Sequence, residues 1–139
     1  MTTKINVLIV DSDVALANAV SKLLSEDSGW YVVNVISGKE CLDIVNNSDS
    51  LDVIVLGMKL TDTIGLELTE RIRDYSDIPI ILLSDDSDIY TLVKAFDSGV
   101  NGYITLPFNE RLFIAHLKAL IRRNNWNKNV LLKSTKLTA

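Results

Sequence analysis

Five short apolar runs, rich in β-branched residues, alternate along the chain with segments whose apolar residues recur at helical spacing. The runs predicted to be strands are Ile5–Val10, Trp30–Ile36, Asp52–Leu56, Ile80–Leu83 and Gly102–Thr105. The segments predicted to be helices cover residues 14–24, 41–45, 65–75, 89–96 and about 108–123. This alternation predicts βαβ units, and therefore an α/β fold: a doubly wound, five-stranded parallel sheet with helices on both faces.

The spacing of apolar residues also assigns faces to two of the helices. On the fourth, Ile89, Leu92, Val93 and Phe96 line one face. On the last, one side is predicted to pack on the sheet and consists of Phe113, Ile114, Leu117, Leu120 and Ile121. The opposite, outer side is predicted to carry Leu112, Ala115, His116 and Ala119.

Polar loops follow three of the predicted strands, at Asp11–Asp13, Gly57–Thr61 and Ser84–Asp86. In open α/β sheets ligands bind beyond the carboxyl ends of the strands, so these loops are expected to converge on one crevice. Gly57 stands at the end of the central strand. Because glycine has no side chain, this position offers no nucleophile, base or metal ligand.

Composition narrows the class of protein. A chain of 139 residues that is 47% hydrophobic suits one domain with a real core, and its longest apolar run is far too short to span a bilayer. The single cysteine, Cys41, is typical of a cytoplasmic protein. A net charge of −4 argues against nucleic-acid binding by the body, although the residues from Arg122 onward carry five Lys/Arg and no acid.

Four motifs, taken in order, resemble the receiver domain of a two-component response regulator, whose fold is flavodoxin/CheY-like. LIVDSD resembles the acidic end of the first strand, and Asp52–Gly65 the acceptor strand with its loop. PIILLS resembles the fourth strand with Ser84 in the switch position, and GVNGYITLPF the fifth with Tyr103 in the switch-aromatic position. The last helix most resembles OmpR/PhoB-type regulators, which pair a receiver with a winged-helix DNA-binding module. The resemblance implies a receiver at residues 1–123, and residues 124–139 as a linker of the kind that leads to such a module.

Three departures from the receiver pattern predict a pseudo-receiver that is not an enzyme and uses no metal or cofactor. The phosphoacceptor position holds Gly57, the second acid of the metal-binding pair is Ser12, and the lysine before the proline is Leu106. Without the acceptor carboxylate, a phosphoryl group has no atom on which to form a covalent intermediate.

The residues that remain at this end of the sheet are open to two interpretations each. Asp11, Asp13 and Asp85 leave an acidic pocket, while Ser12 or Asp13 can cap the following helix. Lys59 either pairs with Asp11 or Asp85 or is a solvated loop lysine. Ser84 and Tyr103 either form a switch pair or are kept for packing and hydrogen bonding.

If phosphorylation cannot drive assembly, the domain is expected to act through an interface that is already formed. In OmpR/PhoB-type receivers the dimer forms through the fourth helix, the fifth strand and the last helix. A homodimer through these elements is therefore predicted, with DNA contacted only through a tethered module and no membrane partner. Its expected interface residues are Tyr90, Lys94, Asp97, Asn101, Leu112, Ala115, His116, Ala119, Arg122 and Arg123.

A second class of function begins from Asp11-Ser12-Asp13-Val14, which resembles the opening motif of haloacid-dehalogenase-type phosphohydrolases. That resemblance implies Asp11 as nucleophile, Asp13 as general acid/base, Ser84 as phosphate ligand and Asp85-Asp86 as a metal pair. Order and spacing argue against it, because the acids follow Ser84 directly and no cap segment is visible.

Overall fold

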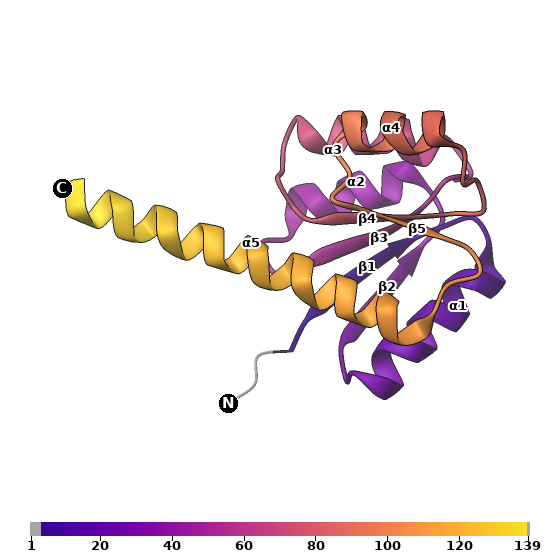
Figure 1. The fold of residues 1–139 in the computed structure, drawn as a ribbon, viewed down its shortest axis with the longest axis horizontal. Helices are drawn as coiled ribbons and strands as arrows, with labels where there is room; N and C mark the ends of the chain where they lie inside the picture. Colours follow the sequence, from indigo (N-terminus) through magenta and orange to yellow (C-terminus); the bar gives the residue numbers. More distant parts are fainter. Residues whose placement is uncertain (1–3, 139) are drawn as a thin grey trace.

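A computed structural model describes the main chain of residues 4–138, and the side chains of residues 4–125 except that of Asp27. Five parallel strands form one sheet in the order β2-β1-β3-β4-β5 (Figure 1). The strands are β1 (Asn6–Val10), β2 (Tyr31–Val35), β3 (Val53–Gly57), β4 (Ile80–Ser84) and β5 (Gly102–Thr105). The helices are α1 (Val14–Lys22), continued by a π-helical turn η1 (Leu23–Asp27), α2 (Gly38–Asn47), α3 (Gly65–Arg73), α4 (Ile89–Ser98) and α5 (Glu110–Thr138). The predicted doubly wound sheet is confirmed.

The helices form a layer on each face of the sheet, α1 and α5 on one side and α2, α3 and α4 on the other (Figure 1). The central strands β3 and β4 are buried along their whole length, as their continuous apolar runs predict. The core-facing side of α5 is also as predicted, since Phe113 and Leu117 are fully buried while Leu112 is 63% exposed.

The apolar face of α4 lies at the surface. Ile89, Val93 and Phe96 are 62%, 51% and 48% exposed, and Ala95 is the fully buried residue of this helix. The helix therefore packs through a small side chain and leaves the larger apolar stripe outside. Periodicity identifies such a stripe but does not say whether it faces the core or solvent.

The last helix is longer than predicted. Its expected end near Arg123 is wrong, because α5 continues without a break to Thr138. No glycine or proline follows Pro107, so the sequence contains no strong helix breaker beyond that point. The predicted linker from residue 124 is therefore helical as far as Thr138, and Ala139 lies outside the described residues.

Within residues 4–138, no helix combines the length and the apolar character that crossing a bilayer requires.

Candidate functional site

The carboxyl ends of β1, β3 and β4 bring together the three polar loops that the sequence singled out. These strands are neighbours in the sheet, with Val10 paired to Leu56 and Gly57 paired to Leu83. Asp11, Gly57 and Ser84 consequently stand side by side at the carboxyl ends of the strands, a location called the Asp11 edge below, as the sheet order requires.

Asp11 fills the place that a side chain of residue 57 would occupy. A methyl group at position 57 would lie 2.7 Å from Oδ1 of Asp11 and nearer still to its Cγ and Oδ2. Gly57 has ordinary strand geometry, since the positive φ angles among the described glycines belong to Gly29 and Gly99. Glycine is therefore required here by the space that Asp11 takes, rather than by the backbone conformation.

The carboxylate of Asp11 is shielded from solvent, with the residue only 7% exposed. Burial raises the pKa of this carboxyl, the N–H of Asp13 acts in the opposite direction, and the charge of Asp13 raises the pKa further. That N–H donates to Oδ1 of Asp11 over 2.9 Å. The acid thus sits in a confined position beside a like charge.

Lys59 meets the Asp11 loop through its main chain. Its carbonyl accepts hydrogen bonds from both the N–H and the hydroxyl of Ser12, at 3.2 and 2.7 Å. The Lys59 side chain is exposed, and its ammonium is not among the groups that shift the pKa of Asp11. This geometry favours the interpretation of Lys59 as a solvated loop lysine over an ion pair with Asp11. Asp85, the other acid considered as a partner, is also exposed.

Two further acids cap helices. Asp13 caps α1, because its carboxylate accepts from the N–H of Leu16 at 3.1 Å. Asp62, in the loop after β3, accepts from the N–H groups of Gly38 and Lys39 at the start of α2, at 2.7 and 3.1 Å. Its pKa is lowered, first by the Gly38 N–H. These bonds hold the Asp62 carboxylate at the start of α2.

Ser84 and Tyr103 are both bonded to the main chain of Asp86. The Asp86 N–H donates to the Ser84 hydroxyl at 3.1 Å, and the Tyr103 hydroxyl donates to the Asp86 carbonyl. The Asp86 carboxylate accepts from the N–H of Asp88 and the hydroxyl of Thr91, both at 2.8 Å, and these bonds lower its pKa in that order. Asp86 thereby joins β4, β5 and the start of α4.

The sequence reasoning missed this central role of Asp86. Its signal was present, since an Asp two residues before another turn residue favours a side-chain-to-backbone bond of this type. The bond from Tyr103 lay beyond any local pattern, because the two residues are 17 positions apart.

Leu106, predicted to stand at the lysine position of the receiver pattern, contributes packing. It is half-buried against the apolar cluster on the α1/α5 face, and its N–H donates to the Ser84 carbonyl at 2.9 Å. The following bond to Pro107 is cis. No cation therefore comes to this edge of the sheet from position 106.

Two residues of the predicted dimer interface are engaged within the domain. His116 does not point outward as predicted, because a methyl group on Gly102 would lie 2.8 Å from its Nε2, so the imidazole packs over β5. The side-chain oxygen of Asn101 accepts from Arg73 and from the Ile80 N–H, both at 2.8 Å. Arg73 also donates to the Gly99 carbonyl at 2.9 Å, which ties α3 to the end of α4.

The carboxylates at the Asp11 edge are not arranged as a ligand set for Mg²⁺, the cation that the receiver pattern implies. Magnesium needs near-octahedral oxygen ligands, whereas the Asp11 carboxylate lies in the space above Gly57 and Asp13 caps a helix. Across the described side chains, no group of three or more His, Cys, Asp or Glu residues could hold a metal ion.

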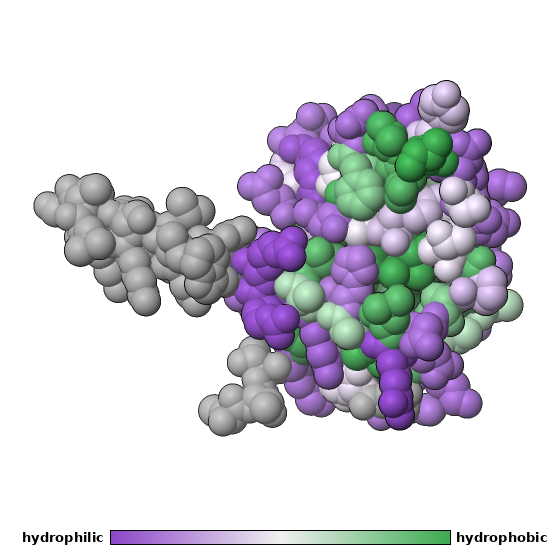
Figure 2. Space-filling model, in the orientation of Figure 1, coloured by the Kyte–Doolittle hydropathy of each residue, from purple (hydrophilic) through white to green (hydrophobic). Residues whose placement is uncertain are grey.

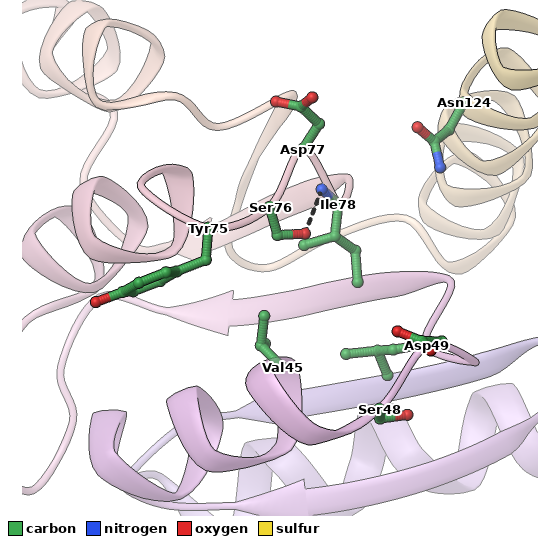
Figure 3. A pocket seen from close by; sticks show the side chains of 9 residues that line it. Val45, Ser48, Asp49, Tyr75, Ser76, Asp77, Ile78 and Asn124 are labelled. Atoms are coloured by element: carbon green, nitrogen blue, oxygen red, sulfur yellow. Dashed lines mark hydrogen bonds between the residues drawn. The ribbon is translucent and has the colours of Figure 1, made fainter.

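A separate cleft lies at the opposite ends of the strands. It holds about 380 Å³ between the end of α2, the turn after α3 and Asn124 of α5 (Figure 3). Asp49 and Asp77 stand on its rim, and its walls include Val45, Leu51 and Ile78. Its position before β3 and β4 separates it from the Asp11 edge.

The sheet order agrees with the comparisons to known proteins. A family model described as "Response regulator receiver domain" matches residues 7–118. The chain belongs to the response regulator receiver domain family. As a receiver domain it is a signalling module and not an enzyme, and the phosphohydrolase alternative is not supported.

Curated relatives of this receiver domain are transcriptional regulators. The chain is 28% identical over 122 residues to the transcriptional regulatory protein CpxR of Escherichia coli strain K12, covering 88% of the chain and 51% of CpxR. It is 31% identical over 129 residues to the cell cycle transcriptional regulator CtrA of Caulobacter vibrioides, covering 92% and 55%. The chain spans about half the length of the curated relatives it matches.

Solved structures of receivers have the same fold. A two-component response regulator from Clostridium difficile superimposes with a TM-score of 0.81 at 25% identity, covering 88% of this chain and 99% of that one. A CheY-like receiver domain protein from Methanospirillum hungatei has the same TM-score of 0.81 at 23% identity, covering 90% and 99%, and shows the fold alone.

Proposed function

We propose that this receiver domain acts without phosphorylation, as a permanent dimerisation module of a cytoplasmic transcription regulator. The observation that carries the proposal is the occupied acceptor position, where Gly57 has no side chain and Asp11 takes its space. Any DNA contact would be made by a tethered module, in keeping with the relatives named as transcriptional regulators.

Three chemical parts of phosphotransfer are missing at this end of the sheet, although Asp11 is kept. A phosphoryl group needs a nucleophile, and position 57 has none. The second acid of the metal-binding pair is replaced by Ser12, whose hydroxyl donates a hydrogen bond to the Lys59 carbonyl. The counter-charge is replaced by Leu106, which packs against apolar residues.

The α4–β5–α5 surface favours a constitutive interface because it is more apolar than the sequence predicted. Ile89, Val93 and Phe96 add an exposed stripe on α4 to the predicted Tyr90, which is 77% exposed, and Leu112 of α5 is 63% exposed. Figure 2 shows the apolar cluster over α4. Burial of apolar surface contributes about 25 cal/mol per Å², whereas exposed ion pairs contribute about 0–1 kcal/mol each.

The chemical half of the proposal is tested by phosphotransfer. Incubation with acetyl phosphate and Mg²⁺ should leave the intact mass unchanged, and beryllofluoride with Mg²⁺ should leave the tryptophan fluorescence unchanged. A base-labile phosphoryl adduct on any aspartate of the chain would refute phosphorylation independence. Weak Mg²⁺ binding by itself would not.

The assembly half is tested by light scattering on the unmodified chain, which should be dimeric at high micromolar concentration. Val93→Asp on α4 and Leu112→Asp on α5 should each give folded monomers, because a charge would be buried without a partner. Val33→Asp is the matched control: Val33 is 55% exposed but lies on β2, the opposite edge of the sheet from β5. A monomeric wild type, or equal dissociation in all three variants, means that the surface is wrong.

A further inference from the structure

We propose that Asp11 and Gly57 form an interlock, in which the carboxylate of Asp11 is a built-in occupant that closes the acceptor position against cations. The inference deepens the proposed function and relies on it only for the role of position 57. It explains why the site is inactive through a contact, in addition to the absence of a side chain.

The contact is specific to one pair of residues. A methyl group at position 57 would meet the Cγ, Oδ1 and Oδ2 atoms of Asp11 as its three nearest neighbours. The backbone of Gly57 is ordinary strand, paired with Leu83, and would accept any L-residue. The carboxylate of Asp11 is therefore the obstacle to a side chain at this position.

The position of Asp11 is also held from its own side. Its N–H donates to the Val35 carbonyl at 3.1 Å, and Oδ1 accepts from the Asp13 N–H at 2.9 Å. Ser12, the next residue, is bonded twice to the Lys59 carbonyl, two residues after Gly57. The β1 loop and the β3 loop are thus joined, so the carboxylate is held in place over the glycine.

Two consequences follow for position 57. A side chain introduced there has to expel the Asp11 carboxylate, so its cost depends on Asp11. Once expelled, the Asp11 carboxylate is free to point outward, where it becomes available to a divalent cation near the Asp13 main chain.

A double-mutant cycle tests the interlock. Gly57→Ala should lower the melting temperature by roughly 5 °C or more, as overpacking a closed site does. The same substitution in an Asp11→Ala background should have at most a third of that effect. Gly38→Ala is the matched control, because its methyl group would meet the Thr63 Cγ2 atom at 2.8 Å and no atom of Asp11. Its effect should be equal in both backgrounds.

Equal shifts for Gly57→Ala with and without Asp11 would overturn the interlock. If Gly57→Ala does not fold alone, recovery of folded protein in the double variant supports it, and failure to recover overturns it. The cation part is tested with Mn²⁺ by paramagnetic broadening of the Asp13 amide signal, which should be stronger in Gly57→Ala than in wild type. Equal broadening would overturn the exclusion of cations. None of these readouts involves phosphorylation, so a phosphoryl adduct would refute the proposed function and leave the cycle intact.

Discussion

Removal of the Tyr103 hydroxyl should loosen the loop between β4 and α4 without disturbing the core. In Tyr103→Phe the half-buried ring keeps its packing, while the hydrogen bond to the Asp86 carbonyl is lost. A hydrogen bond of this kind contributes about 0.5–1.5 kcal/mol to stability. The three remaining bonds of Asp86, to Ser84, Asp88 and Thr91, should keep the loop folded.

The size of the effect on local opening follows from that free energy. If the bond is broken only when the loop opens, its loss should raise amide exchange in the loop about twofold to tenfold. Hydrogen exchange followed by NMR at the Asp86 and Asp88 amides measures this directly. The amides of β3, which open only with the whole domain, should change by no more than the loss in global stability.

Tyr75→Phe is the control for loss of a tyrosine hydroxyl, because Tyr75 is 67% exposed in the turn after α3. It should leave exchange at Asp86 unaltered. Unchanged exchange in Tyr103→Phe would show that the Tyr103–Asp86 bond does not hold the loop. The Ser84 hydroxyl would then be the next candidate, tested with Ser84→Ala.

Four other substitutions have outcomes that follow from the contacts. Because burial raises the folded-state pKa of Asp11, ionisation costs stability as pH rises, so Asp11→Asn should raise the urea midpoint at neutral pH and less in acid. The folded-state pKa of Asp62 is lowered, so its carboxylate stabilises the fold above the ordinary carboxyl pKa, and this contribution is lost as pH falls. Asp62→Ala should therefore lower the melting temperature at neutral pH and much less in acid. Arg73→Met removes three hydrogen bonds from a half-buried guanidinium and should cost about 1.5–3 kcal/mol in urea unfolding, whereas a loss under about 0.5 kcal/mol would contradict the tie between α3 and α4. Lys59→Met should change stability by less than about 0.5 kcal/mol at neutral pH, and a larger loss confined to neutral pH would revive the ion pair with Asp11.

Features that depend on local pattern were predictable from the sequence. Continuous apolar runs predicted the buried strands β3 and β4, and alternation with helices predicted the parallel sheet. Asp13 was one of two expected caps of α1, and Gly99 ends α4 in the left-handed conformation that favours glycine. Each depends on hydrogen bonds or periodicity within a few residues, which the order of residues determines directly.

Several features of the candidate site depended on distances between segments far apart in the chain. The side of α4 that faces solvent was decided by the burial of Ala95 in the apolar cluster on this face of the sheet. His116 packs over β5 because Gly102 leaves room for it. Sequence patterns place these residues on a helix or strand but not against a particular neighbour.

The residue order was enough to show that the central strand ends at a position without a side chain, because Gly57 follows the apolar run that identifies this strand. What fills the space beside Gly57 became visible in the fold, since Asp11 is 46 positions away and reaches Gly57 through the pairing of β1 with β3. It likewise decided that Lys59 meets the site through its carbonyl and not its ammonium. The physical reason is that side-chain packing at a strand end is set by the registers and loops of neighbouring strands, which no local pattern contains.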